Sequence, residues 1–197
     1  MDGVPYSSAV GLVIYSMVSS RPNLANAISV LSQFMSNPGK DHWNAMKWLI
    51  RYIKGTTNVG LVYEKAKGDV WLDGFLDSDY GGDREKRRST TSYVFCLSGC
   101  CVSWKSQLQP IVTLSSTKAE YIAAKEAVKE GLWLQGLLKE LGFLKGKATI
   151  FCDNQSAIHL CKNSMYHERT KHVDIRYHFI REKISDGLIQ VETLQEI

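Results

Sequence analysis

The first 55 residues carry apolar positions at the spacing of amphipathic helices. In NLANAISVLSQFM one helical face carries Leu24, Ile28, Leu31 and Phe34, and Asn37-Pro38-Gly39 then predicts a turn. The next segment, DHWNAMKWLIRYIKG, is predicted to be a helix that begins at an Asp41 N-cap and ends near Gly55. Its apolar face is formed by Trp43, Met46, Leu49, Ile50 and Ile53. These residues predict packed helices without a catalytic pattern.

After a boundary near residue 58 the pattern becomes that of strands separated by helices. A short strand is expected at residues 60–63, and longer ones at 70–77, 90–99, 101–106, 148–153 and 188–194. Helices are expected at 117–141, with Gly131 and Gly136 as weak points, and at 154–163 and 170–185. A hairpin followed by a crossover helix and a parallel strand predicts an α/β fold with a mixed sheet flanked by helices. We therefore expect this domain over residues 59–197, preceded by an α-helical N-terminal extension over residues 1–58.

Composition places the chain among ordinary globular proteins, with 44% hydrophobic and 22% charged residues and a formal charge of +4. The start lacks a signal peptide, and the longest apolar stretch, residues 9–18, has about half the length that a bilayer needs. An intracellular protein without a membrane span is expected. The chain has five cysteines, which is an odd number, and no two of them form a CxxC pair. This predicts reduced and mostly buried thiols. A zinc site with His167 and His172 is the alternative, although no ligand spacing matches a known zinc finger.

Two aspartates follow the apolar residues of the first long strand, in GFLDSDYGG. Aspartate is a poor strand residue, and its carboxylate is a ligand that magnesium prefers. Asp77 directly follows Phe75-Leu76 and is the better candidate for a metal ligand, whereas Asp79 lies nearer the Gly81-Gly82 turn. The alternative is that both aspartates belong to the turn.

Glu120 lies near the start of the long helix, in LSSTKAEYIAAKEA. One interpretation is a capping box, in which Glu120 pairs with Thr117 at the N-cap. The other follows from the small and apolar residues beside it, Ile122, Ala123, Ala124 and Ala127, because such a face can lie close against a sheet. In that case the carboxylate of Glu120 points at the sheet.

Asp153 ends the strand ATIFCD and precedes a helix, so it is either the N-cap of that helix or a further metal ligand. Sites in such sheets tend to lie at strand ends. Asp77, Glu120 and Asp153 are therefore predicted to meet at one edge of the sheet. Carboxylates packed so closely repel one another unless cations neutralise them or their pKa values rise. A pair of metal ions about 4 Å apart, clamping the attacking and leaving oxygens, is the usual purpose of such a cluster on phosphodiesters.

Four segments in this order resemble the ribonuclease H region of copia-type LTR retrotransposon Pol polyproteins: FLDSDYGGDREKRRSTTSYVF, SSTKAEYIAA, FCDNQSAIHL and HERTKHVDIRYHFIREKI. SNPGKDHWNAMKWLIRYIKGT resembles the segment that connects the reverse transcriptase to that region. The resemblance implies a ribonuclease H-like fold and cleavage of the RNA strand of RNA–DNA hybrids. It also implies two Mg²⁺ ions, or Mn²⁺ in their place, held by Asp77, Glu120 and Asp153. The reverse transcriptase part of the polyprotein is the implied partner, and a cytoplasmic virus-like particle or the nucleus the implied location.

The chain departs from the family pattern at several points. The fourth acidic ligand of the family aligns beyond Ile197, so the domain is expected to be truncated at its C-terminus, with Asp174 as the nearest substitute. Ser92 stands where the family usually has glycine. No YxDD-type aspartate pair occurs, so the chain is not expected to carry out reverse transcription by itself. The alternative function is therefore an inactive retrotransposon remnant that retains the fold and binds nucleic acid.

Two basic stretches are candidates for contact with the hybrid, with a solvated charged surface as the alternative for each. The first follows the Asp77 strand and contains Arg84, Lys86, Arg87 and Arg88. The second, between residues 162 and 183, includes Arg169 and Lys171, with His167 as a candidate aid to product release. An integrase-like nuclease is a third interpretation, but it requires a glutamate about 35 residues after the second aspartate. Position 189 is isoleucine, so the order Asp, Glu, Asp favours ribonuclease H.

Overall fold

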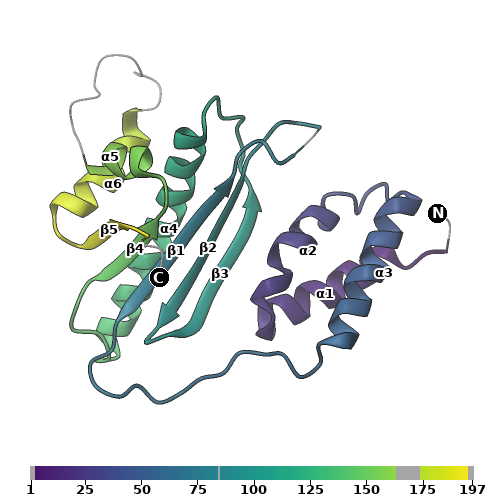
Figure 1. Ribbon diagram of the computed structural model, residues 1–197, viewed down its shortest axis with the longest axis horizontal. Helices are drawn as coiled ribbons and strands as arrows, with labels where there is room; N and C mark the ends of the chain where they lie inside the picture. The colour runs from purple at the N-terminus through teal and green to yellow at the C-terminus, as the bar shows by residue number, and fades with distance from the viewer. Residues whose placement is uncertain (1–2, 84, 163–173, 195–197) are drawn as a thin grey trace. The chain divides into compact units, whose positions relative to one another are not determined.

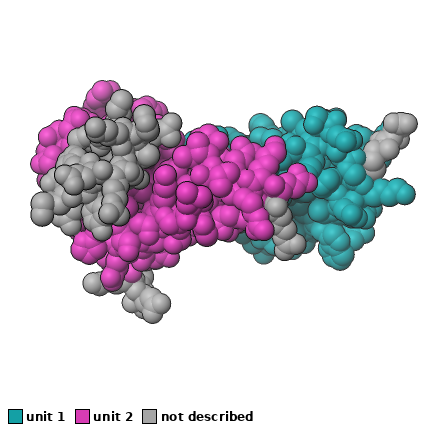
Figure 2. All heavy atoms as spheres, turned by 90° about the horizontal axis from the view of Figure 1, so that it is seen from above, with its two compact units in different colours: residues 1–63, 105–107 teal, residues 64–104, 108–197 magenta. Residues whose placement is uncertain are grey.

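The computed structural model describes residues 3–83, 85–162 and 174–194, without the side chains of 174–178. The chain forms two compact units (Figures 1 and 2). Residues 1–63 with 105–107 make the helical unit, and residues 64–104 with 108–197 make the sheet unit. None of the helices described is both long and apolar enough to cross a membrane.

The helical unit contains α1 (Tyr6–Ser20), a 3₁₀ turn (Pro22–Leu24), α2 (Ala25–Ser32) and α3 (Lys40–Gly55). Its core is built from one face of each helix, with Val10, Ile28 and Met46 almost fully buried. The buried Tyr6 hydroxyl donates to the Leu31 carbonyl at 2.8 Å, which ties α1 to α2. The predicted helical extension is therefore a packed unit with its own apolar core.

Three local predictions for residues 1–63 are wrong. Asp41 is not the N-cap of α3, because the helix begins at Lys40 and the Gly39 N–H donates to His42 Nδ1 at 2.9 Å. Ile50 is 42% exposed and lies off the buried face that Met46 occupies. Residues 60–63 form no strand, since their side chains lie largely in solvent and no ladder pairs them.

The sheet unit contains a five-stranded sheet in the order β3-β2-β1-β4-β5. The strands are β1 (Leu72–Asp79), β2 (Thr90–Leu97), β3 (Cys100–Leu108), β4 (Ala148–Cys152) and β5 (Ile189–Thr193). β1 runs antiparallel to β2 and parallel to β4, and β4 runs parallel to β5. The turn from β2 to β3 has positive φ at Ser98 and Gly99. The predicted mixed sheet flanked by helices is confirmed.

The helix α4 (Ser116–Glu140) packs across β1, β2 and β4, and the helices α5 (Gln155–Lys162) and α6 (Asp174–Ser185) complete the unit (Figure 1). Ala123, Ala124 and Ala127 are buried against the sheet, as their small size predicts. Gly131 is not a weak point of α4 but a place of close approach. A Cβ there would lie 3.0 Å from Ile189 Cδ1 and 3.2 Å from Phe95 Cε1. Small residues on one face of α4 thus let the helix lie close to the sheet.

Candidate metal centre

Asp77 lies in β1, and Asp153 directly follows the neighbouring parallel strand β4. Phe75 of β1 pairs with Phe151 of β4, and their rings stack with centroids 5.4 Å apart on the same face of the sheet. Asp77 and Asp153 each lie two residues further along, so the same register places them level with one another. Both are exposed. Ser92 of β2, the other neighbour of β1, lies directly opposite Asp77.

Glu120 reaches the same edge of the sheet from the second turn of α4. The N-cap of α4 is Ser115, whose hydroxyl accepts from the Lys118 N–H at 3.2 Å, so the capping-box interpretation of Glu120 is wrong. Glu120 is only 5% exposed, and its Oε1 accepts from the Ser78 N–H at 3.0 Å. Its Oε2 is buried without a hydrogen-bond partner. A buried carboxylate oxygen without a partner is costly, and a bound ion is one of the explanations for such an atom.

The raised pKa of Glu120 reflects, in part, the charges of the other two carboxylates. The pKa of Glu120 is raised from 4.5 to about 7, first by burial and then by the negative charges of Asp77 and Asp153. The hydrogen bond from Ser78 acts in the opposite direction. Burial is thus the main cause, and the nearby carboxylates add to the rise as close like charges are expected to do.

Asp153 does not cap the helix that follows it, which was the alternative interpretation of this residue. α5 begins at Gln155, and the Asn154 side chain caps it by accepting from the Ala157 N–H at 2.9 Å. The N-cap interpretation of Asp153 is therefore wrong. Donor atoms of Glu120, Cys152 and Asp153 all lie within 4.8 Å of one another, close enough to share one ion. Among the described residues, Asp77 belongs to no group of three donors that lie so close together.

Cys152 belongs to the same group of donor atoms as Glu120 and Asp153. From the sequence it was predicted only to be a buried thiol. It is 1% exposed, and burial raises its pKa to about 11, so the thiol is neutral at physiological pH. All five cysteines are free, as predicted. Cys152 and Cys161 are buried, whereas Cys96, Cys100 and Cys101 are partly exposed, so the prediction of mostly buried thiols is wrong. The signal for Cys152 was its place directly before Asp153 at the end of a buried strand.

Asp79 differs from Asp77 although it lies on the same strand. Its carboxylate lies so close to Gly82 that a Cβ at that position would collide with it. Gly81, which directly precedes Gly82, has a φ of +65°. Asp79 thus packs against the turn that follows β1, whereas Asp77 faces the charge of Glu120. The turn interpretation fits Asp79 and not Asp77.

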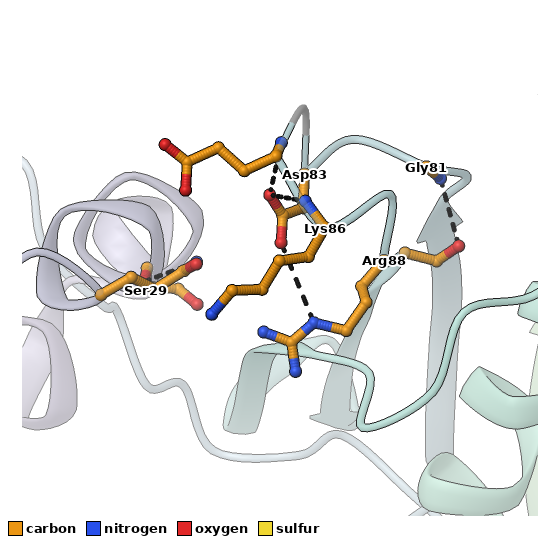
Figure 3. A network of polar contacts seen from close by, with 8 residues as sticks. Ser29, Gly81, Asp83, Lys86 and Arg88 are labelled. Carbon is orange, nitrogen blue, oxygen red and sulfur yellow. Dashed lines mark hydrogen bonds and ion pairs between the residues drawn. The ribbon is translucent and has the colours of Figure 1, made fainter.

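Lys86, Arg87 and Arg88 of the first basic stretch lie in the loop between β1 and β2 (Figure 3). Asp83 Oδ1 accepts from the N–H groups of Glu85 and Lys86, at 3.0 and 3.1 Å. Arg88 Nε lies 3.8 Å from Asp83 Oδ2, so the Arg88 charge is partly engaged within the loop. Lys86 and Arg87 are exposed. They are the two cations that this loop presents to solvent among its described residues.

Arg84, His167, Arg169 and Lys171 lie outside the described residues. Asp174 is the first residue of α6, and its side chain lies outside the description.

A mixed sheet in this order, with acidic residues from β1, α4 and β4 at one edge, defines a ribonuclease H-like fold. Among solved structures, a foamy viral protease–reverse transcriptase in complex with an RNA/DNA hybrid matches 98% of this chain and 25% of its own. The TM-score is 0.62 and the sequence identity 13%, so this likeness concerns the fold.

No family model matches the chain. The retrovirus-related Pol polyprotein from transposon TNT 1-94 of Nicotiana tabacum is 51% identical over 191 residues, which are 97% of this chain. Secreted RxLR effector protein 161 of Plasmopara viticola is 51% identical over 134 residues, which are 68% of this chain and 94% of that protein. The chain belongs to the family of retrovirus-related Pol polyproteins from copia-type transposons. It spans 14% of the length of the tobacco polyprotein.

Proposed function

We propose that this chain is a metal-dependent ribonuclease that hydrolyses the RNA strand of RNA–DNA hybrids. The observation that carries the proposal is the Glu120 carboxylate. It is buried, the charges of Asp77 and Asp153 help to raise its pKa, and one of its oxygens has no hydrogen-bond partner. Three carboxylates of this kind offer hard oxygen ligands, which suit Mg²⁺ and also Mn²⁺.

In this proposal Asp77, Glu120 and Asp153 hold two divalent ions. When bound, the ions supply a water of lowered pKa and stabilise the charge on the departing 3′ oxygen. Glu120 is fixed for this role by the Ser78 N–H, which holds Oε1 and leaves Oε2 without a hydrogen-bond partner. Asp77 and Asp153 are exposed, so they are the carboxylates that face solvent and substrate. The neutral Cys152 thiol lines the buried side of the cluster.

Hybrid recognition is proposed to rest on backbone contacts, with little sequence preference. Lys86 and Arg87 extend from the loop that follows β1, and neither has an ion pair among the described residues. They are proposed to approach phosphates. The partner in a full polyprotein is proposed to be its reverse transcriptase part, since the relative in tobacco is a Pol polyprotein about seven times as long.

The experiment uses purified protein, Mg²⁺ and a hybrid labelled on the RNA strand. Asp77→Asn is compared with Asp79→Asn, the same substitution two residues along the same strand. Asp77→Asn is expected to lower cleavage by more than about 100-fold, beyond the usual effect of residues that only orient metal ligands. Asp79→Asn is expected to keep cleavage within about 10-fold, because Asp79 serves the turn.

Binding of the hybrid without cleavage by the unmodified protein would contradict the proposal and identify an inactive remnant. Equal losses in the two variants would contradict the assignment of Asp77.

A further inference from the structure

Gln109 is a buried polar residue outside the acidic cluster. It directly follows β3, in the sequence SQLQPIV, and is 1% exposed. Its backbone N–H donates to the Ser89 carbonyl at 2.8 Å, which fixes the start of the segment that leads from β3 to α4. Its Oε1 is buried without a hydrogen-bond partner, so the side chain is held by the bonds of its nitrogen.

The Gln109 side-chain nitrogen joins three elements around the cluster. It donates to Thr91 Oγ1 of β2 and to the Ala119 carbonyl of α4, both at 3.0 Å. Ser78 Oγ of β1 accepts a weaker contact at 3.3 Å. One buried nitrogen thus links the first turn of α4 to the strands beneath it.

The partners of Gln109 are the chain neighbours of the proposed metal ligands. Ala119 directly precedes Glu120, and Ser78 directly follows Asp77. The Ser78 N–H in turn donates to Glu120 Oε1 at 3.0 Å. These bonds close a ring that runs through Gln109, Ala119, Glu120 and Ser78. The ring fixes the distance between the backbone that carries Asp77 and the backbone that carries Glu120.

We propose that Gln109 is a positioning residue for the metal centre. It holds the start of α4 against β1, so that Asp77 and Glu120 stay at the separation that a shared ion needs. The inference rests on the proposed function, and it assigns Gln109 no contact with ion or substrate. Residues that orient metal ligands typically contribute 10- to 100-fold, roughly, to metal affinity.

The test measures Mn²⁺ affinity directly, from the electron paramagnetic resonance signal of free Mn²⁺, in the full chain without substrate. Gln109→Met keeps the length of the side chain and removes its donor. The matched control is Gln135→Met. Gln135 is 5% exposed on α4, the helix that carries Glu120, and its Oε1 accepts from the Ala148 N–H at 2.7 Å. It lies fifteen residues from Glu120 along α4, a distance of about 22 Å.

Both variants are expected to lose thermal stability, because each loses buried hydrogen bonds. Only Gln109→Met is expected to weaken Mn²⁺ binding, by about 10-fold or more. In hybrid cleavage at fixed Mg²⁺ below saturation, its kcat is expected to fall while KM for the hybrid stays unchanged. Thr91→Val, which removes one acceptor of the same nitrogen and keeps the shape, serves as a second variant and is expected to weaken Mn²⁺ binding in the same direction.

The outcomes separate this inference from the proposed function. If the unmodified protein binds no Mn²⁺ at the cluster, the proposed function fails, and the role of Gln109 with it. If the unmodified protein binds Mn²⁺ and Gln109→Met binds it equally well, the positioning role alone is overturned. The positioning role is likewise overturned if Gln135→Met weakens Mn²⁺ binding as much as Gln109→Met does. Should Gln109→Met not fold, unchanged Mn²⁺ affinity in Thr91→Val would overturn the inference.

Discussion

Replacing Glu120 by glutamine is predicted to stabilise the metal-free protein at pH 8. The folded protein raises the pKa of Glu120 from 4.5 to about 7. Between these two values the folded state binds more protons than the unfolded state, so stability falls as pH rises through this window. At about 1.4 kcal/mol per pH unit, the full cost of ionising Glu120 in the folded protein is about 3 kcal/mol above pH 7.

Glutamine removes this cost and keeps the shape. Its Oε1 can accept from the Ser78 N–H as before, and its nitrogen takes the place of Oε2 beside two carboxylates. The gain is therefore expected to be about 3 kcal/mol at pH 8 and less than about 1 kcal/mol at pH 5, where Glu120 is largely protonated in the folded state. At pH 8, Mg²⁺ is expected to stabilise the unmodified protein and to have little effect on the variant, since an ion that binds the folded state stabilises it.

The assay is urea unfolding at pH 5 and pH 8 without metal, with Glu126→Gln as the control. Glu126 lies on the same helix and pairs with Lys129 at 3.0 Å in a partly exposed ion pair. Loss of that pair is expected to lower the free energy of unfolding by about 0.5 kcal/mol, with little difference between pH 5 and pH 8. A Glu120→Gln variant that is destabilised at pH 8, or equally stabilised at both pH values, would refute the reasoning.

Three further predictions concern packing, chemistry and binding. Gly131→Ala is expected to destabilise the protein by about 1–3 kcal/mol in thermal unfolding, because its Cβ would press on Ile189 and Phe95. Gly136→Ala on the same helix meets no atom within 4 Å and is expected to stabilise it by up to about 1 kcal/mol; the opposite order would contradict the packing. Iodoacetamide at pH 8 is expected to leave Cys152 unmodified in the folded protein, because the thiol is buried and its pKa is raised to about 11; rapid labelling found by mass spectrometry would show that the site is open. Lys86→Ala and Arg87→Ala are each expected to weaken hybrid binding and to lower the slope of log K against log salt by about 1, whereas an unchanged slope would place these cations away from phosphates.

The sequence was most informative where a pattern extends over several residues. The order of strands and helices predicted the mixed sheet and its crossover helix, and the small residues of α4 predicted the face of the helix that lies against the sheet. The three carboxylates could be singled out because Asp at two strand ends and Glu on a small-residue face are unusual positions for charge. Residues 60–63 show the limit of this approach, because they have the composition of a strand but pair with no strand of the sheet.

The sequence pattern could not decide between the alternative roles of the acidic residues, because these roles depend on individual hydrogen bonds and contacts. Both capping interpretations of the acids were plausible from spacing, and neighbouring residues, Ser115 and Asn154, take those roles instead. Asp77 and Asp79 share a strand face, and their roles are separated by the closeness of Asp79 to Gly82 and by the effect of the Asp77 charge on Glu120. Gln109 could not be found in advance, because its partners come from three elements distant in sequence.

The central claim is that Asp77, Glu120 and Asp153 share divalent ions. Anomalous diffraction from crystals of the protein with Mn²⁺ and an RNA–DNA hybrid tests it most directly. Two manganese peaks about 4 Å apart are expected, with oxygens of all three carboxylates as ligands. Manganese peaks found only elsewhere, or a cluster that stays without metal while the hybrid is bound, would contradict it.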